Sequence, residues 1–239
     1  MTIEIIFRLR RLSCTMWSMI LNNKLFVFDW NGTLLADTVP SWKAGNVCLE
    51  FYGAEAISLK THRETFCFPI IPFYEKHGVS EETVLERRDE GNAVFQDTYE
   101  QLAAGARTRH GARDLLEYLS EQGAECIILS NYITERIERH LKRLNIEHYF
   151  SYVSAHDCNG TTILQSTTKV LRLRDYMSES GHAPENTIII GDTMEEPEIA
   201  RALGITSIGI TDGYISRARL RQAAPDHIVH RLDEIVKLF

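Results

Sequence analysis

Short, uninterrupted apolar runs recur along the chain, and each of them ends at polar residues. Leu25–Phe28 is the first such run, and Cys126–Leu129 and Thr187–Ile190 repeat its pattern. Runs of this length are typical of strands that are buried on both faces of a parallel sheet. Further strands are predicted at 149–154, 207–210 and 226–229, and helices at 112–122, 134–144, 169–177 and after 229. This alternation predicts an α/β protein with a doubly wound parallel sheet and helices on both faces.

The segment 38–107 interrupts this alternation. Its patterns predict helices at 41–52 and 81–102, and Ser80 is a suitable N-cap for the second. Prolines break the aromatic segment 66–73, which is interpreted as packing within the insertion, with a substrate-facing loop as the alternative. The chain is therefore predicted to contain an N-terminal extension at 1–21, a core domain at 22–37 and 108–239, and an inserted all-helical domain at 38–107.

The N-terminal extension, 1–21, does not follow the pattern of the core. Its apolar run, Met16–Leu21, is too short to span a bilayer. Apolar residues precede its arginines, which is the reverse of the order in a secretory signal. We interpret this extension as a poorly ordered tail, or as the product of an upstream start codon with Met16 or Met19 as the true start. A basic segment at a membrane surface is the alternative.

Composition narrows the class of protein. A chain of 239 residues with 25% charged residues is typical of an ordinary globular protein with one large domain or a core and an insertion. A net charge of -7 argues against nucleic acid as a partner. Five scattered cysteines without a C-x-x-C pair indicate reduced thiols and a cytoplasmic protein. We expect no membrane partner, and either a monomer or a homodimer.

Chemically capable side chains follow the predicted strands. Asp29 comes directly after the first run, Ser130 follows the second and Asp192 the third, while Lys169 opens a predicted helix. Parallel sheets bind ligands beyond the carboxyl ends of their strands, where these side chains would meet. Each residue also has an ordinary interpretation on its own. Asn31-Gly32 is a strong hairpin signal, and Asp192 could simply cap a helix.

The order of these motifs resembles that of the haloacid dehalogenase superfamily of phosphohydrolases. Asp29–Thr33 matches the first motif, Ser130 the second, Lys169 the third, and Gly191-Asp192 with Glu196 the fourth. The resemblance covers nearly all of the chain beyond residue 22 and is greatest to the phosphoglycolate phosphatase branch. It implies that the inserted helices form a small cap over the active site. It also implies hydrolysis of a small phosphorylated metabolite.

The resemblance assigns a role to each matched residue. Asp29 would attack phosphorus and form an aspartyl-phosphate, while Ser130 and Lys169 would stabilise the transferring phosphoryl group. Mg²⁺ would be held by Asp29, Asp192 and the backbone carbonyl of Asn31, with Glu196 orienting its surroundings. The remaining predicted contacts to the substrate are Gly32, Thr33, Asn131 and Arg63. Glu195 is expected to be solvated, and the pair Asp37-Thr38 to have a structural role at the hinge of the cap.

Asn31 departs from the family pattern, in which the corresponding Asp protonates the leaving group and then activates water. Asn cannot carry a proton back and forth at neutral pH. The protein could therefore favour substrates with acidic leaving groups, use another carboxylate, or bind phosphorylated ligands with little turnover. A phosphonate hydrolase is a further alternative, because that activity requires no second Asp. Lys43 or Lys60 would then have to form a Schiff base with the substrate.

Overall fold

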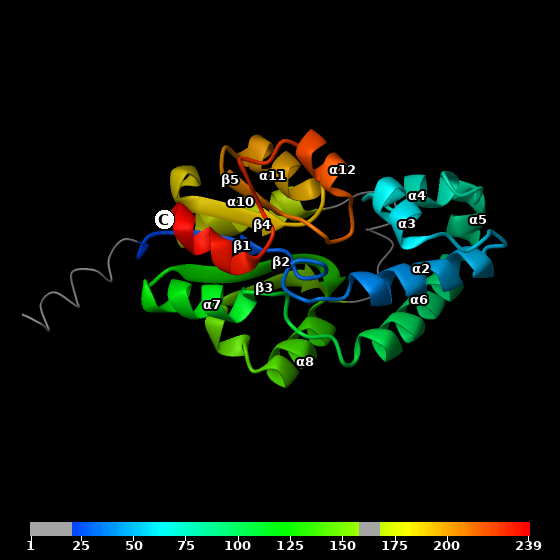
Figure 1. The fold of residues 1–239 in the computed structure, drawn as a ribbon, viewed down its shortest axis with the longest axis horizontal. Helices are drawn as coiled ribbons and strands as arrows, with labels where there is room; N and C mark the ends of the chain where they lie inside the picture. Colours follow the sequence, from blue (N-terminus) through cyan, green and yellow to red (C-terminus); the bar gives the residue numbers. More distant parts are fainter. Residues whose placement is uncertain (1–20, 158–167) are drawn as a thin grey trace, which may run out of the picture.

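The structure, a computed structural model, describes residues 21–157 and 168–239. A six-stranded parallel sheet forms the centre of this part of the chain. The strand order is β3-β2-β1-β4-β5-β6 (Figure 1). The strands are β1 (Leu25–Phe28), β2 (Glu125–Ile133), β3 (Tyr152–His156), β4 (Thr187–Gly191), β5 (Thr206–Ile210) and β6 (His227–Val229). Phe28 at the end of β1 lies beside Ile128 of β2 and Ile190 of β4. The carboxyl ends of these three strands therefore meet at one edge of the sheet.

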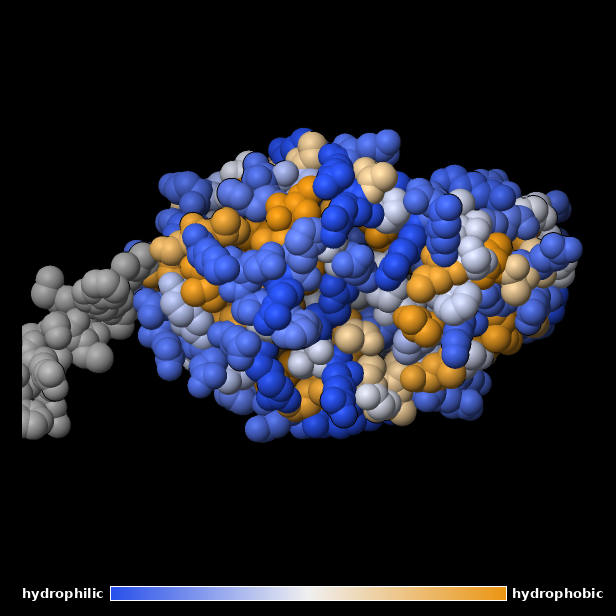
Figure 2. Space-filling model, in the orientation of Figure 1, coloured by the Kyte–Doolittle hydropathy of each residue, from blue (hydrophilic) through white to orange (hydrophobic). Residues whose placement is uncertain are grey.

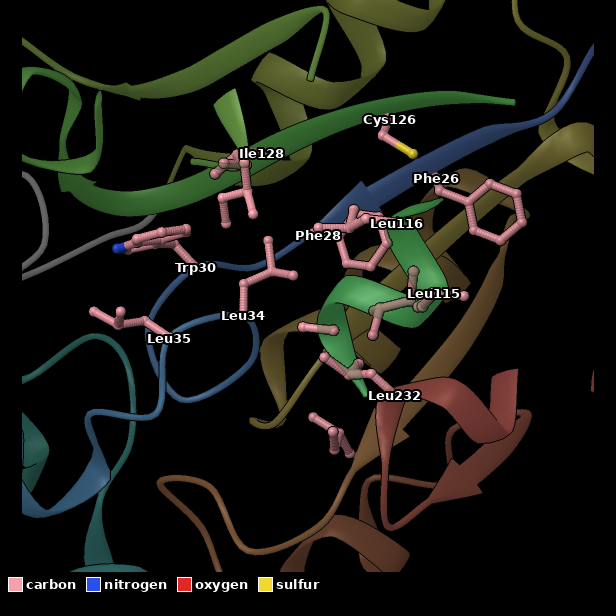
Figure 3. Close-up of a cluster of buried hydrophobic side chains, with 14 of the residues drawn as sticks. Phe26, Phe28, Trp30, Leu34, Leu35, Leu115, Leu116, Cys126, Ile128 and Leu232 are labelled. Atoms are coloured by element: carbon pink, nitrogen blue, oxygen red, sulfur yellow. The ribbon is translucent and has the colours of Figure 1, made fainter. Parts of the chain in front are cut away.

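Helices cover both faces of the sheet, and successive side chains of β1 pack against helices on opposite faces. Phe26 and Phe28 pack on one face, against Leu115 and Leu116 (Figure 3). Val27 packs on the other face in a separate cluster. The core helices are α7 (Ala112–Glu121), α8 (Thr134–Leu144), α10 (Lys169–Ser180), α11 (Glu195–Leu203), α12 (Arg217–Gln222) and the 3₁₀ helix η3 (Leu232–Leu238). The predicted doubly wound α/β fold is confirmed.

A group of helices lies beside the sheet, and we call the segment from Thr38 to Ala103 that contains it the cap (Figure 1). Its helices are α2 (Thr38–Phe51), α3 (Leu59–Thr65), α4 (Ile71–Glu75), α5 (Glu81–Glu86) and α6 (Arg88–Ala103). The two chain segments that join cap and core run side by side. Leu35 bridges to Thr108, and the Ala36 N–H donates to the Arg107 carbonyl at 2.8 Å.

Several elements differ from the sequence prediction, and three show why. The helix predicted at 81–102 is two helices, because Arg87 adopts φ -110° and ψ 23° and ends α5 before α6 begins. Strand β2 continues past Leu129 to Ile133. The C-terminal helix is the 3₁₀ helix η3. The extension 1–21 lies almost wholly outside the described residues.

The surface is largely hydrophilic on the face drawn in Figure 2, where hydrophobic residues occur in small groups. Within the ranges 21–157 and 168–239, no helix has the length and apolar character needed to cross a bilayer. Several of the largest apolar side chains of the described residues lie inside the molecule. Trp30, directly after Asp29, is fully buried, and so are Phe26 and Phe28.

Candidate active site

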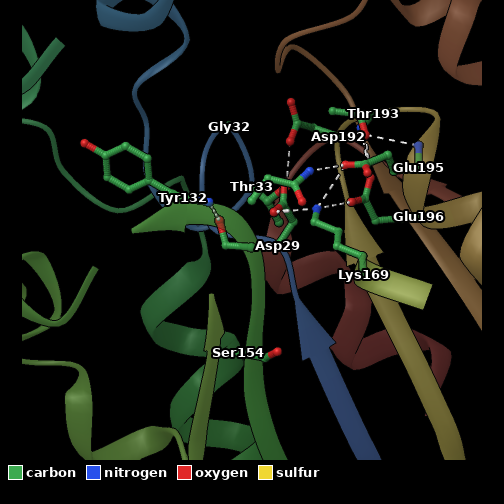
Figure 4. Close-up of polar contacts among 12 residues, drawn as sticks. Asp29, Gly32, Thr33, Tyr132, Ser154, Lys169, Asp192, Thr193, Glu195 and Glu196 are labelled. Atoms are coloured by element: carbon green, nitrogen blue, oxygen red, sulfur yellow. Dashed lines mark hydrogen bonds and ion pairs between the residues drawn. The ribbon is translucent and has the colours of Figure 1, made fainter. Parts of the chain in front are cut away.

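The site lies where β1, β2 and β4 end (Figure 4). Asp29 directly follows β1, and its backbone N–H donates to the Ile190 carbonyl at 2.9 Å, which continues the pairing of β1 with β4. Ser130 lies within β2, and Asp192 directly follows β4. Asp29, Ser130 and Asp192 are at most 7% exposed. Each of the three apolar runs Leu25–Phe28, Cys126–Leu129 and Thr187–Ile190 is therefore followed by one polar side chain at the same edge of the sheet.

Lys169, at the first position of α10, is the positive charge of this site. Its Nζ lies 3.0 Å from Asp29 Oδ1, 3.0 Å from Glu196 Oε1 and 3.2 Å from Glu195 Oε2. The side chain is almost fully buried. Burial lowers the pKa of Lys169, but the negative charges of Asp29, Glu195 and Glu196 outweigh it and raise that pKa well above its usual value. Lys169 is therefore a fixed cation beside Asp29.

The turn after β4 positions Glu196. Its Oε2 accepts a hydrogen bond from the Thr193 hydroxyl at 2.8 Å, while its Oε1 contacts Lys169. A Cβ at Gly191 would lie 2.2 Å from the Glu196 carboxyl carbon, so only glycine allows this approach. The prediction that Glu195 is solvated is wrong. It is 7% exposed and accepts a hydrogen bond from Asn131 Nδ2 at 2.9 Å, because the start of α11 packs against the site.

Asp192 is held by the first motif and by the loop after β5. The Thr33 hydroxyl donates to its Oδ1 at 2.7 Å, and the Tyr214 N–H donates to its Oδ2 at 2.6 Å. Gly32, at φ +74°, approaches so closely that a Cβ would lie 2.4 Å from Asp192 Oδ2. Burial, opposed by these hydrogen bonds, raises the pKa of Asp192 to about 7. Thr33 thus orients Asp192, and it is not among the residues that line the cavity described below.

The balance of charge fits a metal ion. Three buried carboxylates, those of Asp29, Glu195 and Glu196, contact the Lys169 cation, and a fourth, Asp192, interacts electrostatically with Asp29. Burial raises the pKa of Asp29; Lys169 opposes this effect, while Glu196 and Asp192 add to it. Among the described residues, no group of three or more His, Cys, Asp or Glu side chains is arranged to hold a metal. Mg²⁺ requires few carboxylates, because water and phosphate oxygens complete its coordination. The donors present therefore fit Mg²⁺.

Asn31 belongs to a second buried network. Its Nδ2 donates to Asp37 Oδ2 and to the Tyr99 hydroxyl oxygen, both at 2.8 Å. The hydroxyls of Tyr99 and Tyr214 donate to the same carboxylate oxygen of Asp37. Gly32 was predicted to contact the substrate. Its N–H instead donates to Asp37 Oδ1 at 2.6 Å. Both hydrogens of the Asn31 amide are thus used within the protein.

Three other side chains complete the site. The Ser130 hydroxyl oxygen accepts a hydrogen bond from the Tyr132 N–H at 3.1 Å, which leaves its own hydrogen free to turn toward a ligand. Arg172 donates to the Ser130 carbonyl at 2.8 Å. Arg109 donates to the Gly32 carbonyl at 2.8 Å and to the Thr211 carbonyl, which fixes the turn after β1. Neither arginine was identified from the sequence, because single arginines outside a motif carry no signal.

Arg63 binds the core. Its guanidinium donates to the carbonyls of Gly213 and Asp212, at 3.0 and 2.9 Å, and its own carbonyl accepts from the Ser216 N–H. Arg63 is not part of the cavity lining, and neither are Lys43 and Lys60. The structure therefore gives Arg63 a place in the contact between the cap and the core.

A cavity of about 1050 Å³, its open mouth included, separates the site from the cap. Asp29, Asn31, Ser130, Asn131 and Lys169 lie on its core side. The segment 66–73 contributes to its cap side, which agrees with the substrate-facing alternative. The same segment also packs within the cap, because Phe66 and Phe73 are buried in its apolar cluster. Residues of the cap that line the cavity include Tyr52, His62, Phe66, Phe68, Ile70 and Phe73.

Comparison with known proteins agrees with this architecture. The model of the haloacid dehalogenase-like hydrolase family matches residues 26–210. A phosphoglycolate phosphatase from Pseudomonas putida is 24% identical, over 87% of this chain and 77% of its own length. One from Synechococcus elongatus is 25% identical, over 88% of this chain and 94% of its own length. The solved structure of a haloacid dehalogenase-like hydrolase from Streptococcus pneumoniae has a TM-score of 0.74 and 25% identity, and covers 93% of this chain and 99% of its own.

The sheet, the strand-end carboxylates and the family match define the class of protein. The chain belongs to the haloacid dehalogenase-like hydrolases. Relatives named phosphoglycolate phosphatase match most of its length.

Proposed function

We propose that this protein is a Mg²⁺-dependent phosphatase that hydrolyses a small phosphorylated metabolite through an aspartyl-phosphate on Asp29. The observation that carries the proposal is the position of Asp29. It lines the cavity at the end of a buried strand, with its Oδ1 held 3.0 Å from Lys169 Nζ. The relatives named phosphoglycolate phosphatase support a phosphorylated small molecule as the substrate.

In the proposed first step, a carboxylate oxygen of Asp29 bonds to phosphorus while the bond to the leaving oxygen breaks. The Lys169 ammonium and the Ser130 hydroxyl stabilise the negative charge of the phosphoryl oxygens. Bound Mg²⁺, held by Asp29, Asp192 and the Asn31 carbonyl, would neutralise the negative charge that gathers there. Water then attacks the aspartyl-phosphate and releases inorganic phosphate. Glu196 and Glu195 keep Lys169 in place for both steps.

Asn31 is expected to slow the proposed reaction. General acid-base help is typically worth about 10²–10⁴ in rate, and an amide cannot supply it. Because both amide hydrogens of Asn31 are engaged by Asp37 and Tyr99, it has no proton to offer a leaving group. The leaving group must therefore depart with little protonation, and hydrolysis of the aspartyl-phosphate is expected to be slow.

The first test is covalent labelling of the full-length protein. After incubation with an aryl phosphate and Mg²⁺ and a rapid acid quench, mass spectrometry is expected to find phosphate on Asp29. Asp29→Asn should lose both the adduct and turnover. Asp175→Asn is the matched control, because Asp175 is an exposed carboxylate on α10. An adduct on another residue, or full turnover in Asp29→Asn, would show that the proposed nucleophile is wrong. Binding without an adduct or turnover would instead show a phosphometabolite-binding protein.

A further inference from the structure

Aromatic rings dominate the side of the cavity that faces the catalytic residues. Phe66 is central to them, with its ring centroid 5.2 Å from that of Phe68 and 5.1 Å from that of Tyr214, both edge to face. Phe95 and Tyr99 stack on each other at the opposite helix, α6. Rings in these arrangements offer flat apolar surfaces, on which another ring packs well. The part of a substrate beyond its phosphate would therefore lie among aromatic side chains.

The same lining offers no partner for a second negative charge. Among its described residues, Asp29 and Lys169 carry the charges, with His62 the remaining basic side chain. Lys169 is shared by three carboxylates. Burial, reinforced by the positive charges of Arg63 and Arg219, lowers the pKa of His62 to about 3, so its ring is neutral.

The nearby guanidinium groups are engaged elsewhere. Arg63 donates to the carbonyls of Gly213 and Asp212, and Arg219 donates to the carbonyl of Phe66. A carboxylate on the leaving group would therefore lose its water without gaining a cation, which is costly. This argument disfavours phosphoglycolate, the substrate named for the relatives, because its leaving group carries a carboxylate.

The chemistry at Asn31 favours a substrate whose leaving group departs without being protonated. A phenol has a pKa of about 10 and can leave as a phenolate without an acid catalyst. An alkoxide, with a parent pKa closer to that of water at about 15.7, leaves readily only when it is protonated. The amide of Asn31 cannot provide that proton, because it donates to Asp37 and Tyr99.

We infer that the substrate is an aryl phosphate monoester whose aryl group carries no charged substituent and packs among the aromatic side chains of the cap. This inference rests on the proposed phosphatase function and specifies its substrate class. An Asp29 oxygen bonds to phosphorus, and the bond from phosphorus to the aryl oxygen breaks. Its electron pair leaves on the phenolate, which then takes a proton from water. A second water cleaves the aspartyl-phosphate.

The test compares two esters of nearly equal size, 4-carbamoylphenyl phosphate and 4-carboxyphenyl phosphate, with phosphoglycolate as a third substrate. The full-length protein with Mg²⁺ is expected to hydrolyse the neutral ester with a kcat/KM at least about tenfold above that of the anionic aryl ester, mainly through KM. A factor of ten corresponds to about 1.4 kcal/mol. Phosphoglycolate is expected to be the poorest of the three.

A variant adds the missing cation. Asn92 of α6 lines the cavity, so Asn92→Arg should raise kcat/KM for 4-carboxyphenyl phosphate about tenfold without improving the neutral ester. Gln101→Arg is the matched control, because Gln101 is exposed on the same helix and outside the cavity. Equal rates for the two aryl esters, or a preference for either anionic substrate, would overturn the inference and leave the phosphatase function intact. No hydrolysis of any ester and no phosphate on Asp29 would overturn both.

Discussion

Asn31 and Asp37 form a complementary pair at the residue scale. The amide of Asn31 donates to Asp37 at 2.8 Å, and Asp37 is fully buried among four hydrogen-bond donors. Burial raises the pKa of Asp37, although these hydrogen bonds oppose it. A carboxylate at position 31 would replace the attraction by repulsion between like charges at hydrogen-bond distance. The amide therefore fits the position that Asp37 takes in this chain.

We predict that Asn31→Asp alone destabilises the protein by about 1–3 kcal/mol, because a partly buried hydrogen bond is replaced by repulsion between two carboxylates. The double variant Asn31→Asp/Asp37→Asn reverses the direction of the hydrogen bond and should recover most of this loss. Urea unfolding of the two single variants and the double variant gives the coupling energy. Additive effects would show that the two side chains are independent.

The same double variant tests whether the absence of a general acid at position 31 limits the rate of hydrolysis. With a carboxyl group at position 31, hydrolysis of an alkyl phosphate should become about 10²-fold faster, toward the lower end of general acid-base effects. An aryl phosphate should gain much less, because its leaving group needs no proton. Asp37→Asn alone is the control for changes in folding. An equal response of both esters would mean that another group already supplies the proton.

Sequence patterns predicted Asp29, Lys169 and Asp192 because each follows a strand or opens a helix within an ordered set of motifs. They did not predict that Glu195 is buried or that Tyr99 contacts Asn31. The burial of Glu195 depends on how α11 packs beside Lys169. Tyr99 lies 68 residues from Asn31 along the chain, and only the packing of α6 brings them together. Such contacts have no local signal in the sequence.

At the scale of elements, the contact between α3 and the loop after β5 joins cap and core. Arg63 donates to two carbonyls of that loop, and the Ser216 N–H donates back to the Arg63 carbonyl at 2.9 Å. Arg219 of α12 donates to the Phe66 carbonyl from the same side. These contacts place the aromatic segment of the cap over Asp29, so their strength is expected to set how well a substrate is enclosed.

We predict that Arg63→Ala raises KM about tenfold, and by the same factor for 4-carbamoylphenyl and 4-carboxyphenyl phosphate, because the loss is positional. Arg63→Lys should not restore the wild-type value, since an ammonium cannot form both hydrogen bonds in the fixed geometry of a guanidinium. Arg88→Ala, at an exposed arginine of the cap, is the control. A loss confined to the carboxylated ester would instead assign Arg63 to the substrate, as the sequence analysis expected.

The fold of the whole molecule was predictable because a parallel sheet with buried strands requires uninterrupted apolar runs, and these are visible at Leu25–Phe28 and Thr187–Ile190. The break at Arg87 and the 3₁₀ form of η3 were not. Both depend on packing at helix ends, which local propensity describes poorly. A substrate-facing role for segment 66–73 was only the alternative in the sequence analysis, because apolar residues of a cap more often form its core.

Buried carboxylates make the stability of the whole molecule depend on pH. Burial raises the pKa of Asp192 from 3.8 to about 7 in the folded protein and raises that of Asp29 as well. Between these values the folded state binds more protons than the unfolded state, so stability falls as pH rises from about 4 to about 7. A divalent cation beside the two carboxylates favours their charged forms. Its stabilising effect should therefore grow over the same range of pH.

We predict that Mg²⁺ raises the melting temperature little at pH 5 and clearly at pH 8. A concentration of about 100 times Kd supplies about 2.7 kcal/mol, or roughly 5–10 °C for a chain of this size. Asp192→Asn should melt higher than the wild type without Mg²⁺ at pH 8, because it removes a charge that is costly to bury, and should lose the Mg²⁺ shift. Asp175→Asn, at an exposed carboxylate, should keep both properties of the wild type. Thermal unfolding at the two pH values, with and without Mg²⁺, measures all three proteins. If Asp192→Asn instead unfolds at a much lower temperature in both conditions, the carboxylate serves the hydrogen bonds to Thr33 and Tyr214 rather than the metal.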